Sequence, residues 1–298
     1  MKKVRNLKIN IGPFIMYLKK DKQFLLGIII FSVIFFLGFV LSLFAPFDPR
    51  RWNSVPKDMP PSLKYPLGTS SVGQDLFWYL TLAYRNSIIL GFTASAVGLL
   101  IGGFLGLIAG YKGGIIEKII LFFSDTLIVL PGFPLLILIG SLIKKQLSIP
   151  LLGLIIASIT WGMPVRNVRS MVLRLRETEF TYTAKFSGMS TLRIITLEYI
   201  PHISAWVLAS LIGRTFMAIG MEITLAIVGL STLSEATLGT MIYWALKYSA
   251  LPRGIWWWLL DPIIASILLF VSLYLISKGI NEYLDPRHKL ERIAMRGE

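Results

Sequence analysis

FLLGIIIFSVIFFLGFVLSLF (residues 24–44) is a run of 21 residues without a charged side chain. A bilayer core of about 30 Å is crossed by about 20 apolar residues in a helix, so this run predicts a transmembrane span. A basic segment precedes it, as in a signal peptide, but the run is longer than the usual apolar region and lacks a small-x-small cleavage site after it. We therefore expect an uncleaved first span.

The rest of the chain is also rich in apolar residues. Hydrophobic residues make up 55% of the 298 residues, and the mean hydropathy is +0.69, more apolar than a soluble domain. The sequence predicts an all-α membrane protein of six transmembrane helices embedded in the lipid bilayer. The further spans are expected at residues 88–111, 121–143, 149–165, 203–230 and 256–276.

The basic residues indicate the orientation. The net charge is +14, but the Lys and Arg residues flank apolar runs and do not gather on one solvated face, so we expect no nucleic-acid partner. With a cytoplasmic N-terminus, the inner segments carry 20 of these cations and the outer segments 9, which predicts that both termini are cytoplasmic. The expected divisions are a basic cytosolic N-terminus (1–23), a first span (24–45), an external loop (46–87), a core of five helices (88–284) and a cytosolic tail (285–298).

Two segments between spans are too long to be simple turns. The outer one, 45–87, is rich in Pro, and we expect its end, 75–85, to form a short amphipathic interfacial helix. The inner one, 166–201, reads as a short helix over 178–187 that stops at Gly188. Ser190 suits the N-cap of a second helix, which Pro201 closes. A compact helical hairpin of this kind on the cytosolic face favours a docking element.

Three ionisable residues fall inside predicted spans: Asp125, Arg214 and Glu222. Such groups are costly in lipid and should face the bundle interior or a wet cavity. For Arg214 and Glu222 a pore-lining role and a structural role, as an ion pair or an interhelical contact, both stay open. For Asp125, near the cytosolic end of its span, helix capping and gating both stay open.

Two other patterns have structural explanations. The second span has a glycine at every fourth position, which leaves one helix face bare for close packing within the subunit. These glycines are Gly98, Gly102, Gly106 and Gly110. The cluster 256–258 is three tryptophans at the outer end of the last span, where an aromatic belt typically anchors a helix at the interface.

Residue types argue against chemistry in this chain. It has no Cys and two His, and we find no catalytic constellation or metal-ligand spacing, so we expect neither an enzyme nor a bound cofactor. The phosphate-binding G-x-x-x-x-G-K-[ST] run is also missing, so any ATP must be handled by a partner.

The inner hairpin carries a family resemblance. Tyr182, Thr183, Ala184 and Gly188 resemble the E-A-A-x-x-x-G loop of membrane subunits of ABC importers, and Pro201 matches the Pro that closes this loop thirteen residues after the Gly. Tyr182 stands where the acid is usual and Thr183 where the first Ala is usual. Glu177 and Glu179 are candidates to replace the acid.

Three further stretches resemble the second permease subunit of the dipeptide/oligopeptide/nickel branch. The outer segment 65–75, YPLGTSSVGQD, resembles P-L-G-T-D-x-x-G-R-D, with Ser70 and Gln74 in place of the charged pair. Its matching residues are Gly68, Thr69, Gly73 and Asp75, with Arg85 and Ser87 in the continuation. The second stretch resembles an E-x-x-L-x-x-x-G-L run, and its matching residues are Glu222, Leu225, Gly229 and Leu230, followed by Leu238 and Gly239. The third is a terminal L-D-P-R, which residues 284–287 match.

The resemblance implies a permease subunit that forms half of a translocation pathway. Its implied partners are a second homologous permease subunit, two cytosolic ATP-binding subunits and an extracytoplasmic solute-binding protein. Peptides are the leading solutes, with oligosaccharides and nickel chelates as alternatives. The rival hypothesis is a secondary transporter or channel subunit that works without an ATPase, which predicts inverted repeats and discontinuous helices.

Overall fold

The computed structural model describes residues 21–142 and 148–284, and in these ranges the chain forms helices and no strand. The first helical stretch consists of α2 (Lys22–Phe35), a π-helical turn η1 (Phe36–Val40) and a 3-10 turn η2 (Leu41–Phe44). A long loop, 45–75, then leads into α3 (Leu76–Lys112). The remaining elements are α4 (Gly114–Val129), α5 (Gly132–Leu142), α6 (Ile149–Thr160), α7 (Gly162–Arg176), α8 (Glu179–Phe186), α9 (Thr191–Ile194), π-helical η3 (Ile195–Tyr199), α10 (Ile200–Ile227), α11 (Leu238–Lys247) and α12 (Trp256–Leu284).

Four continuous helical stretches are long and apolar enough to cross a membrane: Lys22–Phe44, Leu76–Lys112, Thr191–Ile227 and Trp256–Tyr283. Two bent pairs pass the same test together, α4 with α5 at 88° and α6 with α7 at 54°, which brings the total to as many as six. The prediction of an all-α membrane protein is confirmed. The third and fourth spans, however, are broken where continuous helices were expected.

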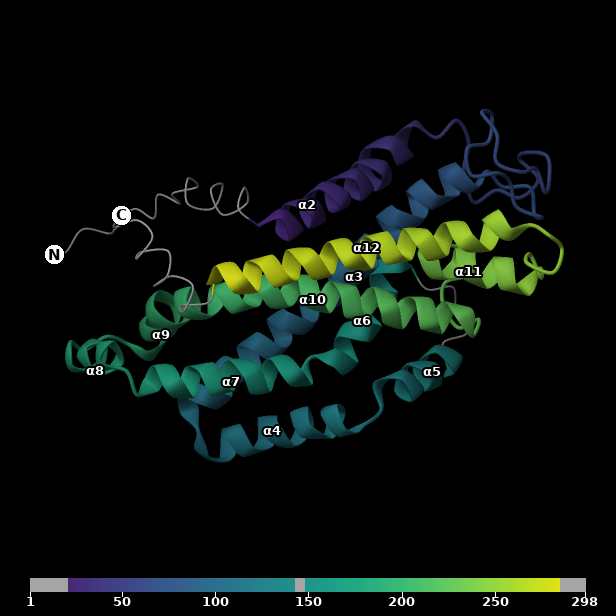
Figure 1. Ribbon diagram of the computed structural model, residues 1–298. Coiled ribbons are helices and arrows are strands. Elements are labelled where there is room, and N and C mark those ends of the chain that lie inside the picture. Colours follow the sequence, from purple (N-terminus) through teal and green to yellow (C-terminus); the bar gives the residue numbers. More distant parts are fainter. Residues whose placement is uncertain (1–20, 143–147, 285–298) are drawn as a thin grey trace, which may run out of the picture.

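The ends of the helices sort into two groups (Figure 1). The start of α2, the end of α12 and the short helix α8 lie at one end of the bundle. The loop 45–75 and α11 lie at the opposite end. This arrangement agrees with the expectation that the first span begins, and the last span ends, on the side of the 166–201 segment. Which side of the membrane this is stays a prediction.

The glycine stripe of α3 packs against α6 and α7, as expected for packing within one subunit. A Cβ placed on Gly106 would lie 2.8 Å from the Val165 carbonyl oxygen, and one on Gly110 would lie 2.7 Å from the Val172 Cβ. Glycine therefore allows α3 and α7 to approach more closely than a side chain would permit.

Residues 75–85 do not form a separate interfacial helix. Asp75 is the N-cap of α3, and its carboxylate accepts hydrogen bonds from the backbone N–H groups of Phe77 (3.0 Å) and Trp78 (3.5 Å). The helix then runs without a break to Lys112, because nothing between residues 76 and 87 stops it. At 37 residues, α3 is longer than a bilayer crossing requires and extends into the loop region.

Pro201 does not close a helix. It lies in the first turn of α10, and the helical path runs through it from Thr191 to Ile227. Proline lacks an N–H and its ring crowds the preceding turn. The turn just before it, η3, is π-helical, and this wider turn accommodates the ring without ending the helix.

A proline accounts for the bend between α4 and α5, and contacts with α4 hold the bend between α6 and α7. Leu130 is extended between α4 and α5, the conformation that a following proline, Pro131, imposes. The second bend, between α6 and α7, is pinned to α4: the Ser124 hydroxyl donates to the Gly162 carbonyl oxygen at 2.9 Å. A Cβ on Gly162 would lie 2.8 Å from the Ser124 carbonyl oxygen.

The tryptophan cluster is only partly an interface anchor. Trp256 is exposed, but Trp257 and Trp258 are buried. The Trp257 Nε1 donates to the Thr69 carbonyl oxygen at 3.2 Å, and the Trp258 ring stacks on Tyr248. Two of the three rings therefore hold loops against α12, where a membrane anchor was expected for all three.

Candidate functional site

The inner hairpin, residues 177–199, consists of α8, α9 and η3 and is called the α8 hairpin below. Its core is formed by Ala184, Ile194 and Tyr199, which pack on Val172 of α7 and Ile203 of α10. Thr181 is fully buried, and its hydroxyl donates to the Leu175 carbonyl oxygen at 2.7 Å. The hairpin is thus fixed to the ends of two membrane helices, and a push on it would be transmitted to them.

Gly188 ends α8 as the sequence predicts. Its φ is +73°, its N–H donates to the Lys185 carbonyl oxygen at 3.0 Å, and the next N–H, of Met189, donates to the Ala184 oxygen at 3.0 Å. This pair of bonds is a Schellman motif, in which a left-handed residue turns the chain away from the helix. Ser190 occupies the N-cap position of α9, also as predicted.

The solvent side of α8 presents Tyr182 and Phe186, which are 44% and 90% exposed. The Tyr182 hydroxyl donates to the Glu177 carboxylate at 3.1 Å, and this hydrogen bond raises the pKa of Tyr182. An acid therefore lies beside the position where the motif's own acid is replaced by Tyr182. Thr183 is exposed and Ala184 is buried, so the small residue of the motif is the one that packs inward.

The opposite end of the bundle carries a second structured region, formed by residues 45–75 and 228–255 and called the loop cap below. Gly68 and Gly73 have φ values of +75° and +73°, and between them Thr69 and Ser70 are fully buried. A Cβ on Gly68 would lie 2.7 Å from the Trp257 ring. A Cβ on Gly73 would lie 2.8 Å from the Val55 carbonyl oxygen, so both motif glycines are required by backbone conformation and by close contact.

The two departures from the outer motif lie next to each other. The Gln74 backbone N–H donates to the Ser70 hydroxyl at 3.0 Å, and the Gln74 side chain donates to the Arg50 carbonyl oxygen at 2.9 Å. Both side chains are buried. A neutral polar pair thus stands where the motif has an acid and a base.

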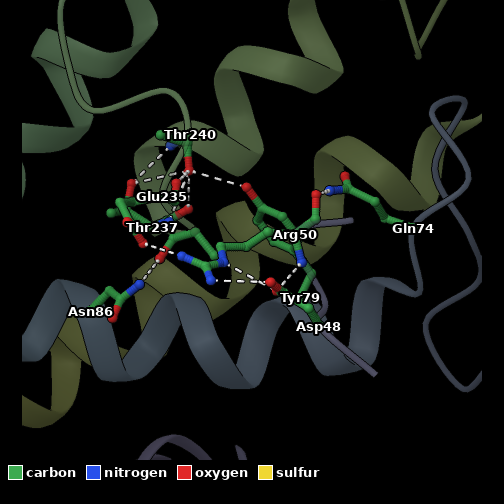
Figure 2. A network of polar contacts seen from close by, with 9 residues as sticks. Asp48, Arg50, Gln74, Tyr79, Asn86, Glu235, Thr237 and Thr240 are labelled. Carbon is green, nitrogen blue, oxygen red and sulfur yellow. Dashed lines mark hydrogen bonds and ion pairs between the residues drawn. The ribbon is translucent and has the colours of Figure 1, made fainter. Parts of the chain in front are cut away.

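Polar contacts join the two segments of the loop cap to each other and to α3 (Figure 2). Arg50 bridges Asp48 and Glu235 at 3.0 and 3.1 Å, and its hydrogen bond lowers the pKa of Asp48. Asn86 of α3 donates to the Ala236 carbonyl oxygen at 2.8 Å, just before α11 begins. Beside it, the Ser87 hydroxyl accepts from the backbone N–H of Leu238 at 3.1 Å.

Arg85, which the outer motif includes, is partly exposed on α3, and its side chain makes no hydrogen bond or ion pair with the described residues. It does not join the contacts that hold the loop cap together. Its neighbours Asn86 and Ser87 do that.

Glu222 has an interhelical role. Its side chain is fully buried, and its Oε1 accepts hydrogen bonds from Ser231 at 2.9 Å and from Thr237 at 2.7 Å. Thr237 is the N-cap of α11 and forms a capping box with Thr240. Gly239 lies close to the same carboxylate, since a Cβ there would be 3.0 Å from Oε2. Of the two roles left open, the structure favours packing over pore lining.

The end of α10 explains the rest of the E-x-x-L-x-x-x-G-L run. Gly229 has a φ of +78°, and its N–H donates to the Ala226 oxygen at 2.8 Å. The Leu230 N–H donates to the Leu225 oxygen at 3.0 Å. This is a second Schellman motif, and Leu225 and Leu230 belong to one apolar cluster.

Asp125 neither caps a helix nor lies buried. Its carboxylate accepts from the Arg166 Nε at 2.7 Å and is partly exposed, so the pair joins α4 to α7 across the bundle. Arg169 and Glu117 form a second ion pair between the same two helices. These pairs would have to shift if α4 and α7 moved apart, which is compatible with a gating role.

Arg214 lies near the middle of α10. Its Nη2 donates to the Thr160 carbonyl oxygen at the end of α6, and its Nε is buried without a hydrogen-bond partner in the described part of the chain. The guanidinium lines a cavity of about 270 Å³ between α3, α10 and the two bent helix pairs. Of the three intramembrane ionisable residues, Arg214 is the one placed beside an open space.

Sequence reasoning missed α11 and the burial of Asn86, Ser87 and Thr237. A usable signal was present at the start of α11: Thr237 followed three residues later by Thr240 is an N-cap pattern before the apolar Met241 and Ile242. The terminal motif at 285–287, the segment 1–20 and the tail 285–298 lie outside the described residues.

The chain matches the family of binding-protein-dependent transport system inner membrane components over residues 102–290. It belongs to this family. Among known relatives, the oligopeptide transport system permease protein OppC of Mycobacterium tuberculosis is 29% identical over 238 residues, covering 80% of this chain and 81% of the relative. The dipeptide transport system permease protein DppC of Bacillus subtilis is 29% identical over 274 residues, covering 91% and 83% of the two chains. DppC of Haemophilus influenzae is 26% identical over 293 residues, covering 95% and 96%.

These relationships establish the class. The chain is a multi-pass protein of the cell membrane and a permease subunit that forms part of a translocation pathway. Membership of this family implies ATPase and permease partners in general. The two bent helix pairs are a feature that the rival hypothesis of a secondary transporter also predicts, but the family assignment decides against that hypothesis.

Proposed function

We propose that this chain is one of two homologous permease subunits of an ATP-driven, binding-protein-dependent importer of peptides. The two permeases together enclose the pathway, two cytosolic ATP-binding subunits hydrolyse ATP, and an extracytoplasmic binding protein delivers the solute at the loop cap. Peptides are favoured because the relatives described above are named as oligopeptide and dipeptide permeases. Oligosaccharides and nickel chelates are the alternatives.

The observation that carries the proposal is the α8 hairpin. It combines a rigid attachment to α7 and α10 with an exposed apolar surface, and the side chain of Phe186 is 90% exposed. Leu192 and Leu197 of the same hairpin are also exposed. Several exposed apolar side chains on one short segment outside the bilayer favour a protein partner. An ATP-binding subunit docked there could move α7 and α10 when it binds and hydrolyses ATP.

The test replaces Phe186 by Asp in the complete importer. Because Phe186 points into solvent, Phe186→Asp should leave the membrane helices folded and the permease pair assembled. A charge in an apolar contact costs several kcal/mol, so co-purification of the ATP-binding subunits should fall by about tenfold or more.

Leu63→Asp is the matched control, because Leu63 is fully exposed at the other end of the bundle, in the loop cap. It should leave the ATP-binding subunits attached. Full recovery of these subunits with Phe186→Asp would rule out the α8 hairpin as their docking surface.

A further inference from the structure

The cavity beside Arg214 lies where both bent spans change direction. Leu130 and Gly132 line it at the α4–α5 bend, and Thr160 and Gly162 line it at the α6–α7 bend. At about 270 Å³ it is slightly smaller than a typical ligand pocket of about 300–1,000 Å³. It therefore has room for the end of a peptide of a few residues.

Arg214 is the only charged residue among the described residues that line this cavity. A guanidinium has five N–H donors, and the structure pairs one of them, with the Thr160 oxygen. An intramembrane cation normally has a counterion. Glu222, two turns further along α10, is already bonded to Ser231 and Thr237, and its carboxylate does not line the cavity.

The other acids of the spans do not supply a counterion either. Asp125 is paired with Arg166 and Glu117 with Arg169. Asp261 belongs to α12, which contributes no residue to the cavity. The positive charge of Arg214 is therefore not balanced by any carboxylate in the part of the chain that the structure describes.

Apart from Arg214, the described residues of the cavity wall carry no formal charge. Helices α5 and α7 begin at this wall, and α4 and α6 end there, so the partial positive charges of two helix N-termini are offset by the partial negative charges of two C-termini. The positive potential therefore comes from the guanidinium of Arg214. The remaining wall is apolar and includes Met163, Met217 and Met221. Methionine side chains are flexible and adapt to ligands of different shape.

We propose that this cavity is an anion subsite on the translocation path, in which Arg214 binds the C-terminal carboxylate of the peptide during its passage. The methionine wall accommodates the adjoining side chains without selecting among them. This assignment rests on the proposed function as a peptide importer. It gives Arg214 a direct contact with the solute, in addition to its bond to the end of α6.

The first test measures the potential in the cavity without transport. The chain has no Cys, so Met217→Cys, one turn from Arg214, introduces a unique thiol in this subunit. Its labelling by the anionic 2-sulfonatoethyl methanethiosulfonate is compared with labelling by the cationic 2-trimethylammonioethyl reagent, in the purified importer. Relative to the same ratio at Leu63→Cys in the loop cap, we expect a preference of about tenfold for the anion.

Arg214→Gln in the Met217→Cys chain should abolish the preference, and Arg214→Lys should keep most of it. If the Gln variant does not assemble, the proposal is decided by the anion-to-cation labelling ratio at Met217→Cys, compared with the same ratio at Leu63→Cys. Equal rates for the two reagents in the parent chain would overturn the proposal, and they would indicate that a carboxylate of the second permease subunit neutralises Arg214.

The second test identifies the ligand. Tri-alanine and tri-alanine amide differ only in the C-terminal carboxylate, and each is added at millimolar concentration during labelling of Met217→Cys. Tri-alanine should slow the reaction and its amide should not. Equal protection by the two peptides, or protection by neither, would overturn the assignment of a carboxylate subsite.

Peptide uptake by the reconstituted importer is measured in parallel. Uptake of tri-alanine without any anion preference at Met217→Cys would defeat this inference and leave the proposed function intact. Lack of ATP-dependent uptake of any peptide by a fully assembled importer would defeat the proposed function itself.

Discussion

The Thr237 hydroxyl donates a 2.7 Å hydrogen bond to the buried Glu222 carboxylate and thereby joins the end of α10 to the first residue before α11. The same carboxylate oxygen accepts from Ser231 in the intervening loop. One side chain therefore fixes both ends of the turn that brings the chain back into the loop cap. Since α11 also contacts α3 through Ser87, Glu222 couples three elements at the loop-cap end of the bundle.

Glu222→Leu should destabilise the subunit. It removes both hydrogen bonds to the carboxylate, and the buried Thr237 hydroxyl loses its strongest acceptor, which costs about 1–3 kcal/mol; the partly buried Ser231 hydroxyl adds less. We expect a lower Tm of the purified importer and a lower yield of assembled complex, measured by thermal melting and size-exclusion chromatography. Glu222→Gln retains an acceptor oxygen and should give an intermediate loss. Glu235→Gln, in the exposed ion pair with Arg50, is the control and should change the Tm little.

The glycine stripe predicts a contrast between neighbouring positions on α3. Gly106→Ala places a Cβ 2.8 Å from the Val165 carbonyl oxygen, so α3 and α7 must separate. Overpacking of this kind typically costs about 1–3 kcal/mol. Gly103→Ala, on the same helix with nothing within 4 Å of the added atom, should be neutral or mildly stabilising. Equal melting temperatures for the two variants would show that the stripe is not a tight contact.

The spans themselves could be predicted because their signal is strong and local. A run such as residues 24–44 has no stable alternative to a membrane helix, and the α2–η2 stretch, Lys22–Phe44, follows it closely. Gly188 and the glycine stripe were also predictable, since a left-handed turn and a close helix contact both demand the same small residue. These features depend on a few adjacent residues.

What the sequence did not predict depends on distant partners. Trp257 and Trp258 occur where an interface belt is expected, but both are buried: Trp257 bonds to the loop 45–75, and Trp258 stacks on Tyr248, just after α11. The bends at Leu130 and Trp161 had prolines nearby, yet proline alone does not decide between a kink and a helix end. Pro201 shows the opposite outcome, since a π-helical turn before it lets the helix continue.

The candidate site follows the same division. The positions of Asp125, Arg214 and Glu222 within spans were evident, but their roles were not. Glu222 belongs to a packing network and Asp125 to an ion pair, whereas Arg214 faces a cavity. The helices that face an intramembrane charge decide whether it packs, pairs with another charge or lines a cavity. A single sequence does not specify those contacts.

The predicted topology can be tested by labelling single cysteines in this Cys-free chain. Ser187→Cys, exposed in the α8 hairpin, should react with an impermeant maleimide only in inside-out vesicles or after permeabilisation. Leu63→Cys in the loop cap should react in intact cells. The expectation rests on the excess of Lys and Arg on the side of the hairpin. Reaction of Ser187→Cys from outside intact cells would reverse the assigned orientation.

Gly188→Val is the sharpest test of coupling between the permease and its ATP-binding subunits. The φ of +73° at Gly188 disfavours any residue with a Cβ by about 1 kcal/mol or more, and a β-branched residue is disfavoured further. Apart from the two chain neighbours of Gly188, no described residue has an atom within 4 Å of the added Cβ, so the strain is confined to the turn after α8. The membrane helices should insert normally. Attachment of the ATP-binding subunits should weaken, and hydrolysis stimulated by loaded binding protein should be lost.

Gly103→Val is the matched control, because its added Cβ also meets open space but its helical backbone needs no positive φ. It should leave both attachment and stimulated hydrolysis near the parent level. The comparison separates the backbone effect at Gly188 from the general cost of adding a side chain. If Gly188→Val retained the ATP-binding subunits and full stimulation, the Schellman turn would be a structural detail of an ordinary loop. The movement of α7 and α10 would then have to be driven through another surface.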